Sequence, residues 1–227
     1  TTPSAHVPLP HVVHEGDDYR LELEFLVHPL RDGLLVRYRL DGEGNQLHVL
    51  VAPHLGGDRA DNYAWAGADL AAQRGTRALC VRASGGFRRT SAGYVGASDG
   101  WQDFARHGEM TWSYDRASSG NVALTGALAA NAGTLALCFS TSVDGARTLA
   151  RTSLADDYDT TRALFVSGWE NWGRGLELPP APPELRRAAE LSAAVLKVHE
   201  DRTYNGAVVA SLSVAWGQSH DDPGGYH

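Results

Sequence analysis

Hydrophobic and polar residues alternate in several short segments of the first 140 residues. Between Tyr19 and His28 every second residue is apolar and most of the others are charged. This period of two predicts a half-buried antiparallel strand with one face in water. The alternation recurs over 34–40 and 47–51, and Asp32-Gly33 and Asp41-Gly42 supply turns between the segments. The pattern predicts a meander of three strands.

The rest of this region predicts further short strands separated by loops. Residues 1–18 are predicted to be an extended lead-in, and 52–72 a long polar loop. Asn131-Ala132-Gly133 is predicted to close a hairpin between the last two strands. Many short strands with turns between them are typical of an all-β fold, a sandwich of antiparallel sheets. The additional strands are predicted over 78–82, 110–114, 122–128 and 134–139.

After Ser153 the period changes to that of a helix. Ser153 and Asp156 have the spacing of a capping box, which predicts a helix start, and Gly173 or Gly175 is expected to end the helix. Acidic residues at this start interact favourably with the helix dipole. The buried face of the helix is predicted to hold Tyr158, Thr161, Phe165, Trp169 and Trp172.

The segment Pro179-Pro180-Ala181-Pro182-Pro183 is a stiff, extended spacer. It is the best candidate for a domain boundary, so we predict one domain over 1–178. Proline also suits the first turn of the next helix, which is predicted over 184–198. Residues 179–199 are therefore predicted to form a proline-rich linker and a helix.

Net charge limits the classes of partner, and the two cysteines raise the question of a disulfide. A net charge of −7 over 227 residues argues against nucleic acid or an anionic membrane surface as a partner. The apolar run 121–140 is too interrupted for a membrane span, and each half alternates as a strand does. Cys80 and Cys138 are predicted to be buried free thiols, although the sequence leaves a disulfide between them open.

The C-terminal residues carry a resemblance to a known family. Val198-His199-Glu200-Asp201, residues 206–211 and Asp222-Pro223-Gly224-Gly225-Tyr226-His227 resemble the opening of the catalytic domain of bacterial glucoamylases and glucodextranases. These are inverting, exo-acting enzymes of glycoside hydrolase family 15 with an (α/α)6 barrel. The resemblance implies that 200–227 is the truncated start of that barrel.

Pieces of the leading domain also resemble this family, whose enzymes carry an N-terminal super-sandwich domain. The resemblance implies that the parent protein releases glucose from α-glucan ends, with the barrel domain as an intramolecular partner. Both catalytic glutamates of the family would lie beyond His227, so no catalytic residue is assigned here, and no cofactor is implied. The similar pieces are 35–38, 52–57, 91–96, 98–103 and 120–126.

Aromatic residues are the candidates for sugar binding. By resemblance, Tyr226 would line the subsite for the terminal glucose in the parent, whereas in this chain we expect it to be a terminal residue without packing. Trp65 and Trp101 are predicted to lie in loops, where an indole ring can form a surface platform for a sugar. The other tryptophans, Trp112, Trp169, Trp172 and Trp216, are expected to pack in the core or at the domain junction.

Two alternatives remain open for the function, and one for a metal. The chain could be a stand-alone carbohydrate-binding module that uses Trp65 or Trp101, or a sugar-epimerase-like sandwich. Oxygen atoms of Asp58, Asp61 and Asn62 could ligate calcium, but their spacing does not fit an EF-hand. Solvated loop residues are the simpler interpretation, and no metal site is predicted.

Overall fold

The structure is a computed structural model, and it describes residues 6–201, 203–204 and 206–208. The chain divides into two compact units. The first, which we call the β body, is Pro10–Tyr158. The second, which we call the helical body, comprises the described residues of Thr1–Leu9 and Asp159–His227.

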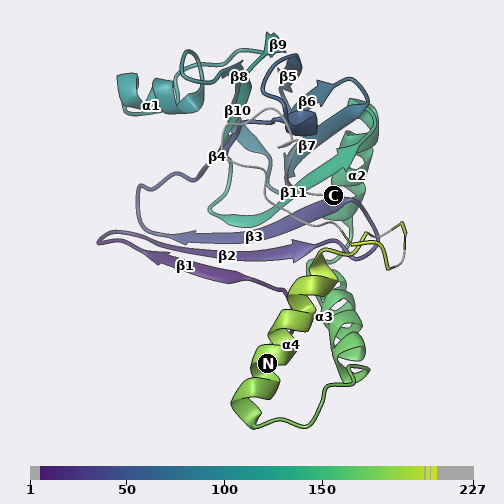
Figure 1. Ribbon diagram of the computed structural model, residues 1–227. Coiled ribbons are helices and arrows are strands. Elements are labelled where there is room, and N and C mark those ends of the chain that lie inside the picture. Colours follow the sequence, from purple (N-terminus) through teal and green to yellow (C-terminus); the bar gives the residue numbers. More distant parts are fainter. Residues whose placement is uncertain (1–5, 202, 205, 209–227) are drawn as a thin grey trace. The chain divides into compact units, whose positions relative to one another are not determined.

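The β body is built on an eight-stranded antiparallel sheet with the order β1-β2-β3-β11-β7-β6-β5-β9 (Figure 1). Alternation sets its two faces, so that Leu79 and Val81 of β7 point into the core, whereas Cys80 between them points to the other face. The strands are β1 His11–Glu15, β2 Arg20–Val27, β3 Gly33–Asp41, β5 Asn62–Ala66, β6 Leu70–Arg74, β7 Arg77–Ala83, β9 Arg116–Gly120 and β11 Ala132–Ser140.

A smaller sheet of three antiparallel strands faces the large one. Its order is β4 (His48–Val51), β10 (Val122–Leu128) and β8 (Phe87–Tyr94). The hydrophobic core lies between the two sheets and includes residues from both, such as Leu124 of β10 and Leu79 of β7. Every residue of β10 is buried, because the core covers one face of this strand and helix α1 (Gly100–His107) packs on it as well.

This architecture confirms the predicted all-β sandwich, but two predicted strand pairings are wrong. The segments 122–128 and 134–139 are strands joined by a turn, yet β10 belongs to the small sheet and β11 to the large one. They therefore form no hairpin. Likewise β4 leaves the expected meander and pairs with β10. The meander of the structure is β1-β2-β3, which begins inside the predicted lead-in.

Two further segments differ from the sequence prediction. The predicted loop 52–72 contains a short 3-10 helix, η1 (Leu55–Gly57), the strand β5 and the start of β6. The predicted strand 110–114 is irregular, and β9 begins only at Arg116. The first error arises because short side chains and the buried polar Asn62 interrupt the apolar alternation of β5. At 110–114 the alternation is regular, but the backbone N–H groups of Thr111 and Trp112 donate to the Asp103 carboxylate rather than to a neighbouring strand.

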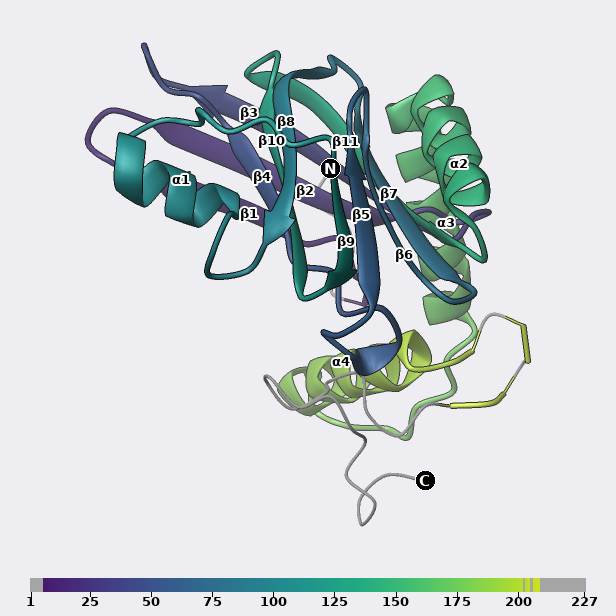
Figure 2. The ribbon, with the colours of Figure 1, turned by 90° about the horizontal axis from the view of Figure 1, so that it is seen from above.

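Two helices of the β body were not predicted. Helix α1 begins after Asp99, whose side chain accepts a hydrogen bond from the Gln102 backbone, and it ends at Gly108 in a left-handed conformation with φ 76°. Helix α2 (Val143–Ala155) begins after Ser142, which caps it through the Gly145 backbone. Figure 2 shows α2 lying along β7 and β11, against the outer face of the large sheet.

The helical body contains α3 (Tyr158–Arg174), whose first residue still belongs to the β body, and α4 (Pro183–Val198). The expected end of α3 near Gly173 and the expected helix over 184–198 are confirmed. The expected start is wrong, because Ser153 lies inside α2 and Asp156 is the residue that ends that helix. Trp169 and Trp172 are half-buried, and their rings meet edge to face at 5.3 Å.

The apolar run 121–140 forms β10, β11 and the turn between them. Among the residues that the structure describes, none of the helices combines the length and the apolar character needed to cross a membrane. The three-part division at 178 and 199 stays a prediction.

Candidate functional site

Strand β5 presents two aromatic rings on one face. Asn62 and Ala64 point inward and are fully buried, so Tyr63 and Trp65 project from the opposite face of the sheet. Their ring planes lie within 20° of parallel, and the ring centroids are 6.5 Å apart. The Tyr63 side chain is 44% exposed and Trp65 is half-buried. The predicted platform residue Trp65 therefore lies in a strand rather than a loop, and sequence reasoning missed its partner Tyr63.

Register places two polar residues beside these rings. Gln73 of β6 is directly opposite Tyr63, and Arg116 of β9 is directly opposite Trp65. Directly opposed residues of antiparallel strands share a face of the sheet. The surface therefore combines two aromatic rings with an amide and an exposed guanidinium.

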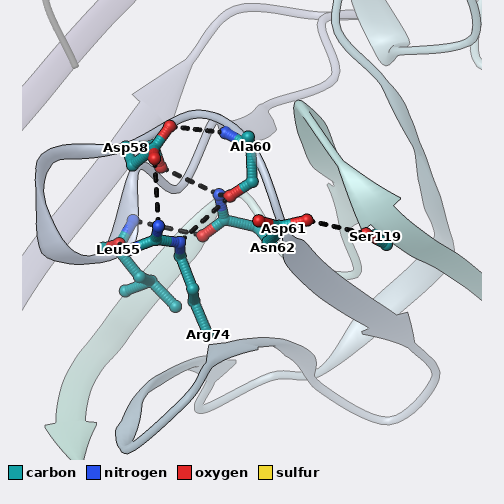
Figure 3. A network of polar contacts seen from close by, with 7 residues as sticks. All are labelled: Leu55, Asp58, Ala60, Asp61, Asn62, Arg74 and Ser119. Carbon is teal, nitrogen blue, oxygen red and sulfur yellow. Dashed lines mark hydrogen bonds and ion pairs between the residues drawn. The ribbon is translucent and has the colours of Figure 1, made fainter.

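A polar network fixes the start of β5 (Figure 3). The buried Asn62 amide accepts a hydrogen bond from the Leu55 backbone at 3.2 Å and donates to the backbone oxygens of Asp58 and Ala60, both at 2.9 Å. Arg74 of β6 donates to the Asp58 carboxylate at 2.9 Å. A buried amide with these partners holds the loop and β5 in one geometry. The network thus positions the strand that carries Tyr63 and Trp65.

The same network occupies the oxygens that were considered for calcium. The Asp58 carboxylate accepts hydrogen bonds from Arg74 and from the Ala60 backbone, and Asp61 accepts one from the Ser119 hydroxyl at 3.1 Å. Asp61 adopts a left-handed backbone with φ 55°, which Asp tolerates better than most residues. In the described part of the chain, no group of three or more metal-ligating side chains is present.

Trp101, the second predicted platform residue, lies in the first turn of α1 rather than in a loop. Its side chain is 69% exposed. Trp112 was expected in the core, but it is half-buried on the surface of this region. Its ring has neighbours on several sides, namely His107, Tyr114 and the Arg106 guanidinium, whose centre lies 5.5 Å from the ring centroid.

A buried carboxylate ties α1 to the segment that follows it. Asp103 is 1% exposed and accepts hydrogen bonds from the Thr111 backbone at 2.8 Å and the Trp112 backbone at 2.7 Å. The Thr111 hydroxyl donates to it at 2.6 Å, and His107 Nδ1 lies 2.8 Å away. The Asp103–His107 pair resembles the base and orienting group of a hydrolase, but the acceptor capacity of Asp103 is taken up by structural hydrogen bonds.

An open pocket of about 310 Å³ lies on the outer face of β1, β2, β3 and β11. Charged residues line it, but their partners are within the protein. Glu22 is 2.8 Å from Arg20 and 3.9 Å from His11, and Glu24 accepts a hydrogen bond from the Tyr158 hydroxyl at 3.0 Å. Carboxylates held in this way are poorly placed for proton transfer to a substrate.

Cys80 and Cys138 are free, fully buried thiols, which confirms the sequence prediction. They lie directly opposite each other on β7 and β11. Burial, together with the nearby Asp69 carboxylate, raises the pKa of Cys80 to about 12, and burial also raises the pKa of Cys138. Since the thiolate is the reactive form, both side chains serve packing rather than chemistry. Tyr226 and Trp216 lie outside the described residues.

Three comparisons bear on the family. A family model described as glucodextranase, domain N, matches residues 1–174. A glucoamylase of Clostridium sp. (strain G0005) is 28% identical over 225 residues, which cover 92% of this chain and 32% of the relative. A bacterial glucoamylase solved in complex with acarbose has a TM-score of 0.84 at 21% identity, over 94% of this chain and 34% of that one.

The structural match supports the fold, and this chain spans about a third of the length of each of the two glucoamylases. The family match extends over the whole β body and reaches the last residue of α3. It agrees with the resemblance that the sequence carries in its leading domain. The chain belongs to the glucodextranase domain N family.

Proposed function

We propose that this chain is the N-terminal accessory domain of a glucoamylase-type hydrolase that releases glucose from α-glucan ends with inversion. The family match over 1–174 supports this proposal, as do the two glucoamylases, each about three times as long as the matched region. Inverting hydrolysis needs a carboxylic acid and a carboxylate roughly 6.5–9.5 Å apart across the scissile bond. We assign both groups to a catalytic domain that follows this chain.

The isolated chain is expected to lack hydrolytic activity. Incubating the 227 residues with maltooligosaccharide is expected to release no glucose above the uncatalysed background. The reason is that Glu22 and Glu24, the acidic residues of the open pocket, are engaged by neighbouring residues. Chromatography of the products over hours measures this, with a complete glucoamylase as the positive control. Glucose release that scales with the concentration of the chain would contradict the proposal.

The observation that carries the accessory role is the apolar surface of α4. Leu185, Val195 and Leu196 are 62%, 56% and 66% exposed. With 3.6 residues per turn these three lie on one side of the helix, and the only fully buried residue of α4 is Ala194. A helix normally buries such a side against a neighbour, and a contiguous exposed apolar patch marks an interface. We assign this interface to the catalytic domain.

This docking role predicts different effects in two proteins. In the isolated chain, Leu196→Asp is expected to cost no more than about 1 kcal/mol, because the side chain is 66% exposed and the main penalty is the helix dipole, which disfavours an acidic residue in the last turn of α4. In the full-length hydrolase the same change is expected to cost about 2 kcal/mol, since it removes a buried leucine from the interface. Thermal unfolding of both proteins, together with heat inactivation of glucose release, measures the difference.

Arg187→Asp supplies the matched control, because Arg187 is also exposed on α4 but is not apolar. It is expected to be nearly neutral in both proteins. Equal stability of the full-length protein with Leu196→Asp and with Arg187→Asp would refute docking through α4.

A further inference from the structure

The Tyr63–Trp65 pair differs from the other aromatic pairs of the described residues in the orientation of its rings, whose planes lie within 20° of parallel. Trp112 has an arginine and two further rings around it, and Trp169 and Trp172 meet edge to face. Among the residues that the structure describes, the rings of Tyr63 and Trp65 have only each other as aromatic neighbours. Both side chains project from the same face of β5 and are accessible to solvent, so together they give this face an apolar surface.

We infer that this face of β5 is a binding surface for a neutral α-glucan chain, separate from the α4 interface. We call it the β5 platform and define it by Tyr63, Trp65, Gln73 and Arg116. Aromatic ring faces pack on the apolar faces of pyranose rings, and the Tyr63 hydroxyl can bond to a sugar oxygen. Successive side chains on one face of a strand follow its line, which suits a linear ligand.

The polar residues of the platform match the hydroxyl groups of a sugar. Gln73 donates its amide N–H to the Gly75 carbonyl at 2.9 Å, so its amide oxygen can accept from a sugar hydroxyl. Arg116 is exposed beside Trp65 and can donate to sugar oxygens. A few directed polar groups around an apolar surface fix the orientation of a ligand. A neutral ligand also suits a chain with a net charge of −7.

The platform is rigid before a ligand arrives. Asn62 precedes Tyr63 and is held by three hydrogen bonds to the loop 55–60, and β5 pairs with a strand on each side. Pre-organised rings lose little conformational freedom on binding, which favours affinity. The choice of an α-linked glucan rests on the proposed function, whereas the location of the platform rests on the geometry alone.

Calorimetric titration of the 227-residue chain with maltoheptaose tests the inference, with cellohexaose as the β-linked comparison. The unmodified chain is expected to bind maltoheptaose saturably and cellohexaose at least about tenfold more weakly. Trp65→Ala and Tyr63→Ala are each expected to weaken maltoheptaose binding by about tenfold or more, which equals 1.4 kcal/mol. Trp101→Ala is the control, because Trp101 is exposed on α1 and lies outside the platform.

Circular dichroism of each variant shows whether it is folded. If Trp65→Ala unfolds the chain, Tyr63→Ala decides the question, because that side chain is 44% exposed. No saturable binding by the unmodified chain would overturn the platform, as would loss of binding in Trp101→Ala with binding retained in Tyr63→Ala. Equal binding of cellohexaose would overturn the α-glucan assignment. These results are independent of the α4 test, which is made in the full-length protein.

Discussion

Asp103→Ala is expected to lower the free energy of unfolding of the β body by about 3 kcal/mol. The carboxylate is 1% exposed and accepts hydrogen bonds from the Thr111 and Trp112 backbones. An alanine leaves these two N–H groups without their acceptor, and an unsatisfied buried polar group costs about 1–3 kcal/mol. The change also releases the Thr111 hydroxyl and His107. Urea unfolding followed by tryptophan fluorescence measures the loss.

Asp144→Ala provides the comparison for the loss of an acidic residue. The Asp144 side chain is 96% exposed in the first turn of α2, and its ion pair with Arg147 is long at 3.9 Å. Removing it is expected to cost no more than about 1 kcal/mol through the helix dipole and this pair. If the two variants lose the same stability, then Asp103 does not hold α1 to the segment that follows it.

The stabilisation of the fold by Asp103 is expected to depend on pH. Burial by itself raises the pKa of Asp103, but the hydrogen bonds from Thr111, Trp112 and His107 outweigh burial and hold the pKa below its usual value. At low pH the unfolded chain therefore binds more protons at Asp103 than the folded chain does. The carboxylate of Asp103 stabilises the fold above about pH 4, and this stabilisation is lost as the pH falls toward the pKa of the folded state. Asp103→Asn should therefore flatten the decline of stability below about pH 4.

Alternation along the chain predicted the faces of the sheets but not their partners. The segment 122–128 is a strand as expected, but all of its residues are buried, so no polar face shows which sheet it joins. Its neighbour β11 pairs with β3 and β7 across the large sheet. A period of two in hydrophobicity indicates which side chains of a strand are buried. It does not indicate which other strand that strand pairs with, because pairing depends on contacts between distant segments of the chain. The predicted hairpin failed for this reason.

The two missed helices show what a hydrophobic period cannot detect. The buried residues of α2 are Ala146, Ala150 and Ser153, which are small and give little contrast with the exposed ones. The buried residues of α1 are Gly100 and Asp103. The capping residues did carry a signal, since Asp99 and Gly108 mark the start and end of α1. Local cap chemistry would have found this helix where periodicity did not.

The candidate site was predictable only in part. The sequence singled out Trp65 and Trp101 as tryptophans outside the core, and both have surface-accessible rings. It could not pair Trp65 with Tyr63, because the pairing requires β5 to be a strand. The polar Asn62 on the buried face of β5 breaks the apolar alternation by which a strand is recognised. Four of the hydrogen bonds that fix the start of β5 join Asn62 and Arg74 to Leu55 and Asp58. The residues they join are 4 to 19 positions apart in the sequence, so only the folded chain reveals these contacts.

Gly93→Ala is expected to destabilise the β body by about 3 kcal/mol. Gly93 lies in β8 opposite Ala123, and the turn after β8 folds back so that Ser98 lies over it. The Ser98 side chain accepts a hydrogen bond from the Tyr94 backbone at 3.0 Å, and the Ser98 backbone donates to the Tyr94 carbonyl. A methyl group on Gly93 would overlap the Ser98 carbonyl oxygen, which cannot move by changing a rotamer. Overpacking of this kind costs about 1–3 kcal/mol or more.

Gly67→Ala is the matched control, and the sign of its effect should be opposite. No atom lies within 4 Å of a methyl group at Gly67, and the backbone there does not require glycine. Alanine at such a position is expected to stabilise by about 0.4–1 kcal/mol, because it restricts the unfolded chain. Denaturant unfolding of both variants measures the difference. A loss at Gly93 no larger than about 0.5 kcal/mol would contradict this prediction, because it would show that the turn over β8 moves away from the added methyl group at little cost.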